Sequence, residues 1–205
     1  MQQVCSRQLA DLAEIYRDDV ELVSVERPTD GTNSGWCTQL FERRQVVQRQ
    51  WNQKAGDLMA IRNSLEADLP AEGLDALCTE LELASDVLTE LLGCARIGFR
   101  VVTLNRPMCP RFHVDQVQAR LLITIRGPGT EWIPSNHVDR SAFADRNNQQ
   151  PPIQTGERIK QFEAGHWALL KGGAWNDDFR GVVHRSPQSD RPRLLVSVDP
   201  IADAA

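Results

Sequence analysis

Apolar residues near the start of the chain recur at the spacing of an amphipathic helix. This spacing predicts a helix over 9–16, with Ser6 as a candidate N-cap. A short strand is predicted over 20–25, where apolar and charged residues are mixed. The segment 28–35 is rich in Thr, Asn, Asp, Ser and Gly, and this composition predicts a loop.

Two longer helical patterns follow. The first covers 36–69, with Gly56 as a candidate break, and Pro70 ends it. The second covers 71–92 and is followed by Gly93, which fits a C-terminal cap. Its apolar stripe consists of Leu74, Leu77, Leu81, Ala84, Leu88, Leu91 and Leu92. We expect this stripe to pack on a sheet of the same chain, with a homodimer seam or another contact surface as the alternative.

The pattern changes from helical to β near residue 97. Strands are predicted over 99–104, 118–126, 131–133, 167–171, 181–184 and 193–199. Between them lie turns at 127–129 and 172–178 and a polar, exposed loop over 144–157. We therefore expect an α+β protein in which a helical region, residues 1–97, packs on a C-terminal sandwich or jelly roll, residues 98–205.

The strand over 118–126 has two different faces. Ala119, Leu121, Ile123 and Ile125 share one face, and Arg120, Leu122, Thr124 and Arg126 share the other. The apolar face is suited to a core. The face with two arginines and a threonine either lines a polar pocket or meets water.

Composition narrows the class of protein. A net charge of −5 and a pI near 5.4 argue against binding to nucleic acid or to an anionic membrane, because both need a basic face. No apolar run approaches the length of a membrane span. The five cysteines are odd in number and include no CxxC pair, which favours free thiols in a cytoplasmic protein. The substrate expected is a small molecule or another protein.

The candidate chemistry lies at His113-Val114-Asp115, directly before the long apolar strand. A second His-x-Asp, at 137–139, lies in a loop or helix start, so we prefer the first as a ligand pair. His184 follows at the end of a short apolar strand. Two histidines and one carboxylate form the facial triad of non-haem Fe(II) oxygenases, which leaves coordination positions open.

A co-substrate acid such as 2-oxoglutarate can take two of those open positions, and its far carboxylate then needs a cation. Arginine is preferred because its planar fork matches a carboxylate. Arg193 opens the final strand nine residues after His184 and is the first candidate. Arg191 is the nearby alternative, and Arg120 and Arg126 are more distant ones.

Several segments resemble a known family. They are Cys-Pro-Arg-Phe-His-Val-Asp (109–115), Ala-Arg-Leu-Leu-Ile-Thr (119–124), Gly-Pro-Gly-Thr-Glu-Trp-Ile-Pro (127–134), Val-Asp-Arg (138–140), Ala-Gly-His-Trp-Ala-Leu-Leu-Lys-Gly (164–172) and Val-His-Arg-Ser-Pro (183–187). They closely resemble the bacterial family known as domain of unknown function 1826. More remotely, the order of these parts is similar to that of prolyl-hydroxylase-type 2-oxoglutarate/Fe(II) oxygenases.

The remote resemblance implies a double-stranded β-helix, a cupin-like jelly roll, with His113, Asp115 and His184 as iron ligands. It also implies that Arg193 clamps 2-oxoglutarate. The tyrosine that often holds this co-substrate is missing, because Tyr16 is the only tyrosine, so Thr124 or Arg126 would take its place. The loop over 144–157 with Trp132 and Trp175 would form a substrate lid, although packing is the alternative for both tryptophans.

A second function remains open. Cys109, four residues before His113, would complete a four-ligand set suited to Zn(II). Genes of the resembling family often lie near metal-chaperone-type GTPases, which implies a non-catalytic role in zinc homeostasis. A closed site with a thiolate would favour this role, and a three-ligand site would favour the oxygenase.

Overall fold

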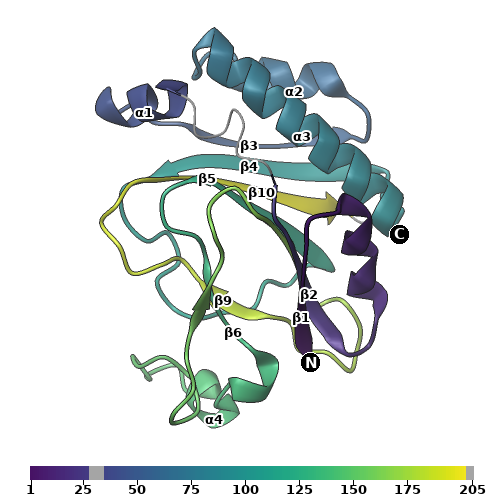
Figure 1. The fold of residues 1–205 in the computed structure, drawn as a ribbon, viewed down its shortest axis with the longest axis vertical. Helices are drawn as coiled ribbons and strands as arrows, with labels where there is room; N and C mark the ends of the chain where they lie inside the picture. Colours follow the sequence, from purple (N-terminus) through teal and green to yellow (C-terminus); the bar gives the residue numbers. More distant parts are fainter. Residues whose placement is uncertain (28–34, 202–205) are drawn as a thin grey trace.

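Two β-sheets face each other, and helices cover the outer side of the larger sheet (Figure 1). The computed structural model describes residues 1–27 and 35–201. The loop predicted over 28–35 lies outside the described residues, apart from Gly35. No helix in the described part of the chain is long and apolar enough to cross a membrane.

The larger sheet has seven strands in the order β1-β2-β8-β5-β10-β4-β3. These strands are β1 (Gln2–Ser6), β2 (Val20–Val25), β3 (Gln48–Lys54), β4 (Arg96–Leu104), β5 (Ala119–Arg126), β8 (Trp167–Lys171) and β10 (Arg193–Ile201). Neighbouring strands are antiparallel except for the parallel pair β1 and β2. The neighbours β5 and β10 carry Thr124, Arg126 and Arg193 of the predicted site.

The smaller sheet has the order β7-β6-β9, with β6 (Glu131–Ile133), β7 (Lys160–Gln161) and β9 (Val183–Arg185). An antiparallel bridge between His113 and His184 extends it by one more segment. From β4 onward the chain passes back and forth between the two sheets, with β6 and β7 as one antiparallel pair in the smaller sheet, and this winding is that of a double-stranded β-helix. The jelly-roll part of the predicted fold agrees with this winding.

The helices are η1 (Leu9–Tyr16), α1 (Gly35–Glu42), α2 (Leu58–Leu65), α3 (Ala71–Leu92), η2 (Ser135–His137) and α4 (Arg140–Ala144). Gly93 ends α3 in the left-handed conformation that a glycine cap adopts. Five residues of the α3 stripe, Leu74, Leu77, Leu81, Ala84 and Leu88, are buried against the large sheet. The stripe therefore packs on the chain's own sheet, and an interaction surface built on it loses its main support. A homodimer stays a prediction.

The helical pattern predicted over 36–69, with Gly56 as a candidate break, is correct only at its two ends, where α1 and α2 lie. Residues 48–54 form β3 instead, which pairs along the full length of β4. Trp51 stacks on Phe99 of β4 with ring centroids 5.0 Å apart. This cross-strand packing outweighs the helical preference of the polar residues around it, because β-structure depends on neighbours more than on local propensity.

The description of residues 1–97 as a helical region needs correction, because β1, β2 and β3 all belong to the larger sheet. A boundary between two domains at residue 97 stays a prediction. Ser6 is also not the N-cap of η1, since it ends β1 and Gln8 holds that position. The strands predicted after residue 97 begin and end within three residues of the observed ones.

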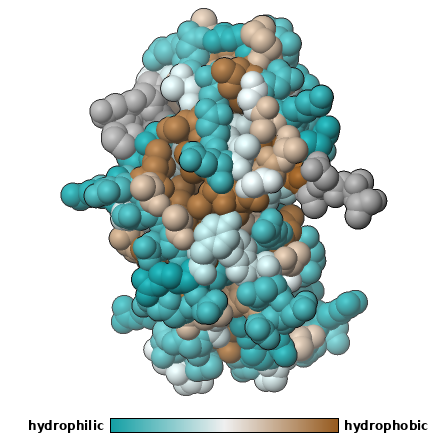
Figure 2. All heavy atoms as spheres, turned by 90° about the vertical axis from the view of Figure 1, so that its right-hand side faces the viewer, coloured by the Kyte–Doolittle hydropathy of each residue, from teal (hydrophilic) through white to brown (hydrophobic). Residues whose placement is uncertain are grey.

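Two apolar layers hold the architecture together. The larger layer lies between α1–α3 and the outer face of the seven-stranded sheet, where Leu121, Ile123 and Ile125 of β5 are buried. The second layer lies between the sheets and includes Leu122, Trp132 and Leu195. Figure 2 shows that hydrophobic atoms gather in the upper half of one face, over the helix-covered part, while the lower half is mostly hydrophilic.

Candidate metal centre

The backbone brings His113 and His184 opposite each other. His113 N donates to His184 O at 2.9 Å, and His184 N donates to His113 O at 3.0 Å. Directly opposed residues of an antiparallel pair point their side chains to the same face. The two imidazole rings accordingly lie with centroids 4.6 Å apart, and Asp115 follows two residues after His113. The fold thus brings together two histidines that are 71 positions apart in the sequence.

The three side chains offer ligand atoms at the spacing that a metal ion requires. The Nε2 atom of His184 lies 3.0 Å from Asp115 Oδ2, and the Nε2 atom of His113 lies 3.5 Å from Asp115 Oδ1. Their ligand atoms all fall within 4.8 Å of one another. Two atoms that each sit about 2.1 Å from an ion, at right angles, are roughly 3 Å apart. The two distances to Asp115 are close to this value, so one ion could contact all three side chains.

Backbone carbonyls orient both imidazoles. His113 Nδ1 lies 3.0 Å from Arg111 O, and His184 Nδ1 lies 3.0 Å from Val182 O. A carbonyl oxygen only accepts hydrogen bonds, so each Nδ1 carries a proton and each Nε2 is turned toward Asp115. The hydrogen bond with Asp115 raises the pKa of His113, and a metal ion would displace any Nε2 proton in the cluster. Histidine ligands of protein metal sites are held in this way.

Arg120 fixes the carboxylate ligand. Its Nη1 donates to Asp115 Oδ2 at 2.6 Å, while its Nε and Nη2 donate to Asp199 at 2.7 Å each. Burial by itself raises the pKa of Asp115, but hydrogen bonds with His113 and His184 and the charge of Arg120 outweigh it and hold that pKa well below its usual range. Asp115 is therefore ionised, as a metal ligand has to be.

A cavity of about 320 Å³ opens beside the three ligands. It is lined by Arg100, Met108, Cys109, His113, Asp115, Arg120, Leu122, Thr130, His184, Arg185, Ser186, Leu195 and Ser197. Cys109 lines this cavity but does not belong to the ligand cluster. Its backbone instead exchanges hydrogen bonds with Ser186. A four-ligand set that includes the Cys109 thiol is thus not formed in this structure.

Arg193 is a buried cation without a carboxylate partner among the described residues. Arg193 is only 3% exposed, and its Nη2 donates to Thr124 Oγ1 and Thr130 Oγ1 at 3.1 Å each. Its Nε and Nη1 atoms are buried and have no hydrogen-bond partner. Burial lowers the pKa of Arg193 to about 10. Such a group is costly unless an anion accompanies it.

Gly127 lets the turn after β5 approach Arg193 closely. A Cβ atom at this position would lie 2.3 Å from Pro192 O and 2.8 Å from Arg193 Cα, and φ is +93°. We expect Gly127→Ala to destabilise the fold by about 2–4 kcal/mol, from left-handed backbone strain and this clash together. Urea unfolding measures the effect.

Gly156→Ala is the matched control for Gly127→Ala. Gly156 also has a positive φ, +88°, but nothing lies within 4 Å of its added Cβ. It should cost only about 1 kcal/mol. Equal losses for the two variants would show that the approach of the 127 turn to Arg193 does not matter for stability.

Sequence reasoning placed some site residues better than others. Thr124 lies in the site, where it accepts from Arg193. Arg126 instead donates to Thr38 Oγ1 in α1, at 2.7 Å. Arg120, considered as a co-substrate cation, is engaged by two carboxylates. Thr130 was not singled out, although its position after Gly127-Pro128-Gly129 put it inside the segment that resembles oxygenases.

The remaining candidates lie away from the ligands. Trp132 is 1% exposed and stacks on Phe162 between the sheets, which favours packing. Trp175 contacts Tyr16, with ring centroids 5.5 Å apart, and does not line the cavity. In the second His-x-Asp, Asp139 caps α4, and His137 Nδ1 lies 3.0 Å from Glu157 Oε2. The preference for the first His-x-Asp agrees with this geometry.

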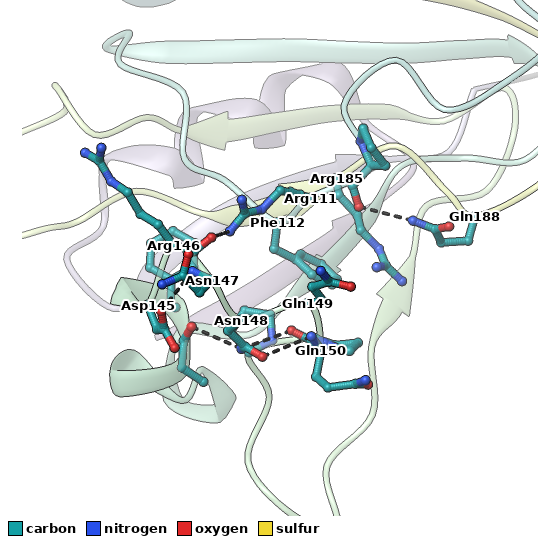
Figure 3. A pocket seen from close by; sticks show the side chains of 15 residues that line it. Arg111, Phe112, Asp145, Arg146, Asn147, Asn148, Gln149, Gln150, Arg185 and Gln188 are labelled. Atoms are coloured by element: carbon teal, nitrogen blue, oxygen red, sulfur yellow. Dashed lines mark hydrogen bonds between the residues drawn. The ribbon is translucent and has the colours of Figure 1, made fainter.

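A separate groove of about 560 Å³ lies beside the segment that precedes His113 (Figure 3). The loop after α4 forms much of its wall, so the predicted 144–157 lid faces this groove and does not line the metal cavity. Arg185 is the lining residue that the groove shares with the cavity. Its guanidinium sits 4.4 Å from the Phe112 ring centroid and pairs with Glu131 at 2.6 Å. This packed side chain separates the two spaces.

Known structures share the fold. The dioxygenase for auxin oxidation 1 of Arabidopsis thaliana, in a complex with 2-oxoglutarate, matches with a TM-score of 0.62, 9% identity and coverage of 100% of this chain and 93% of that one. The rice dioxygenase for auxin oxidation matches with a TM-score of 0.59 and 15% identity, and the match covers 98% of this chain and 83% of that one. A Pseudomonas putida prolyl-4-hydroxylase matches with a TM-score of 0.52 and 10% identity, and the match covers 96% of this chain and 100% of that one. The fold is that of 2-oxoglutarate/Fe(II) oxygenases.

Sequence comparison adds the family. No curated protein matches the chain. The family described as "Protein of unknown function (DUF1826)" matches residues 6–199, which include the three candidate metal ligands. The resemblance of the segments between residues 109 and 187 is thereby confirmed, and the chain belongs to the DUF1826 family.

Proposed function

We propose that this protein is an Fe(II)- and 2-oxoglutarate-dependent oxygenase. The observation that carries the proposal is a pairing of two features in one space. The His113, Asp115 and His184 cluster lines a cavity, and Thr130 on the wall of that cavity is hydrogen-bonded to Arg193, the buried cation without a counter-ion. This co-substrate needs a metal ion to bind its 2-oxo acid end and a cation without a counter-ion to bind its far carboxylate.

The donor set fits iron better than a closed structural metal. Two imidazoles and one carboxylate would supply three ligands to an iron ion and leave its other coordination positions free. The cavity beside them provides room for further ligands. Structural zinc sites, in contrast, are closed by four protein ligands, usually with thiolates.

The Arg193 guanidinium, which Thr130 on the cavity wall holds, is the proposed partner of the distal carboxylate of 2-oxoglutarate. Its Nε and Nη1 atoms have no hydrogen-bond partner and remain free to donate to an anion. The hydroxyls of Thr124 and Thr130 accept from Nη2 and so hold the guanidinium plane. An acid bound here would neutralise the buried charge.

When bound, iron and 2-oxoglutarate supply an oxidation in which dioxygen converts 2-oxoglutarate to succinate and carbon dioxide and oxidises the substrate. The protein's own residues hold this centre in place. Arg120 fixes the orientation of Asp115, and the Arg111 and Val182 carbonyls fix the two imidazoles. Leu122 and Leu195 give part of the cavity an apolar wall, which limits water near the ligands.

The structural relatives support the proposal through their fold. One of them is a dioxygenase solved with 2-oxoglutarate, and another is a prolyl-4-hydroxylase. Their low identity, 9% and 10%, carries no information about the substrate.

Anaerobic spectroscopy tests the proposal. Purified protein is loaded with one equivalent of Fe(II), and 2-oxoglutarate is added without oxygen. We expect a weak visible charge-transfer band that saturates at one equivalent of the acid, and slow conversion of 2-oxoglutarate to succinate once oxygen is admitted. A protein that binds Fe(II) tightly but gives neither band nor succinate is not a 2-oxoglutarate oxygenase.

Replacing Cys109 distinguishes the zinc alternative. Because the thiol lies outside the ligand cluster, Cys109→Ala should leave both Fe(II) and Zn(II) stoichiometry and affinity within about twofold of wild type. Elemental analysis after dialysis against a competing chelator measures this. Loss of stoichiometric zinc in Cys109→Ala, without any 2-oxoglutarate band in wild type, would favour a zinc-binding role.

A further inference from the structure

We propose that the substrate of this centre carries a single carboxylate, which Arg100 binds in a channel that continues from the metal cavity. That the bound molecule is a substrate rests on the proposed oxygenase function. The anion site itself rests only on geometry and charge. The residue that determines this specificity is Arg100, which the mechanism above does not use.

The metal cavity continues into a second, larger space. This space has a volume of about 580 Å³, and its wall includes Arg100, Arg120 and Ser197, which also line the metal cavity. The groove in Figure 3 shares only Arg185 with that cavity, and Arg185 is packed on Phe112. The channel past Arg100 is therefore the better connected route to the ligands.

The register of the large sheet builds the floor of this channel. Gln50, Arg100 and Ser197 lie side by side on β3, β4 and β10, and the adjacent row holds Asn52, Gly98 and Asp199. The face is the inner one, because Ile97, Phe99 and Val101, at the alternate positions of β4, are buried under the helices. Arg100 is consequently fixed at the junction between channel and metal cavity.

Charge selects the kind of ligand. Arg100 Nη2 donates to the neutral Gln50 Oε1 at 2.9 Å, and Arg100 takes part in no ion pair with a carboxylate of the described chain. Arg120 is compensated by Asp115 and Asp199. Arg100 is thus the arginine of this wall that has no carboxylate partner among the described residues, and the two nearby carboxylates disfavour a dianion. A monovalent carboxylate matches this balance better than a phosphate.

The rest of the channel suits a ligand that is polar beyond its carboxylate. The amide side chains of Gln50, Asn52 and Gln116 line it together with the Ser197 hydroxyl. Amides donate and accept hydrogen bonds, so they pair with amide or hydroxyl groups of a ligand. Gly98 and Ala174 also line the channel, and their small size leaves room for a ligand.

Matched acid and amide probes test the inference. N-acetylglycine and the neutral N-acetylglycinamide share one body and differ in the charged group. Their binding to full-length Fe(II)-loaded protein is measured anaerobically by ligand-observed NMR, with saturating 2-oxoglutarate present to fill the Arg193 end. The variants are Arg100→Gln and, as control, Arg158→Gln, which removes an exposed arginine that lines none of these spaces and makes no ion pair.

We expect N-acetylglycine to bind wild type and Arg158→Gln equally, to bind Arg100→Gln about 10- to 100-fold more weakly, and to bind far better than the amide. Equal binding of acid and amide, an unchanged affinity in Arg100→Gln, or tighter binding of methyl phosphate than of N-acetylglycine would each overturn the inference. Thermal unfolding of Arg100→Gln near that of wild type shows that the variant folds. The expected acid-selective binding without any 2-oxoglutarate band would instead refute the oxygenase proposal and leave the Arg100 anion site intact.

Discussion

Replacement of His184 by alanine should abolish stoichiometric Fe(II) binding and, with it, the visible band given by 2-oxoglutarate. His184 is the most buried of the three ligands, 6% exposed, and its Nε2 lies 3.0 Å from the carboxylate of Asp115. Loss of a mere hydrogen-bond partner of a ligand costs roughly 10–100-fold in metal affinity, and loss of the ligand itself should cost more. Elemental analysis and anaerobic titration measure the effect.

His137→Ala is the control for His184→Ala. It removes the histidine of the second His-x-Asp, whose ring contacts Glu157 and lies outside the ligand cluster. Metal content and the band should be unchanged in this variant. Full iron stoichiometry in His184→Ala, or its loss in His137→Ala, would show that the metal centre has been assigned to the wrong residues.

Replacement of Arg193 by methionine should have opposite effects on the free and on the loaded protein. Without 2-oxoglutarate, burial lowers the pKa of Arg193 from its ordinary value to about 10, which corresponds to a cost of about 3 kcal/mol in the folded state at neutral pH. Removing the cation should therefore raise the free energy of unfolding of the free protein, by about 1–3 kcal/mol after the lost threonine contacts. Urea unfolding measures this gain.

The sign of the pH effect is fixed by the direction of that shift. A base whose pKa is lower in the folded state destabilises the fold fully below the folded pKa, and the penalty shrinks as the pH rises through about 10 toward the pKa of a free arginine. The advantage of Arg193→Met should accordingly be constant from pH 6 to 9 and decrease above pH 10.

In the presence of 2-oxoglutarate, wild type should become more stable than Arg193→Met. Wild type gains stability as the co-substrate pairs with Arg193, whereas Arg193→Met should bind 2-oxoglutarate at least about 100-fold more weakly and gain nothing. Iron binding should persist, because Arg193 lies outside the ligand cluster. Arg191→Met, at an exposed position two residues away, should behave as wild type. Equal stabilisation of all three proteins by 2-oxoglutarate would exclude Arg193 as its partner.

Local patterns in the sequence located the parts of the site that depend on a single element. The alternation along β5 separated Leu121 and Ile123, which face the helices, from Arg120 and Thr124, which face the site. The strand that follows His113-Val114-Asp115 indicated which of two His-x-Asp pairs is rigidly held. These inferences need only the two-residue period of a strand.

Patterns failed where long-range contacts decide the outcome. Residues 48–54 carry a polar, helix-compatible sequence and nevertheless form an edge strand, because β4 offers them hydrogen bonds and Phe99 offers Trp51 a stacking partner. Likewise, Arg120 meets Asp199 across 79 residues, and Arg193 meets Thr130 across 63. No local period encodes such pairs.

The sequence by itself determined the family, the ligand types and the faces of Leu121, Ile123, Arg120 and Thr124 on β5. Only the tertiary structure decided that His184 lies opposite His113, that Cys109 remains outside the cluster, and that Arg193 is a buried cation without a counter-ion. The reason is physical. Which face a side chain occupies follows from the period of its own strand, whereas its distance to another ligand follows from the register between strands that the whole core fixes.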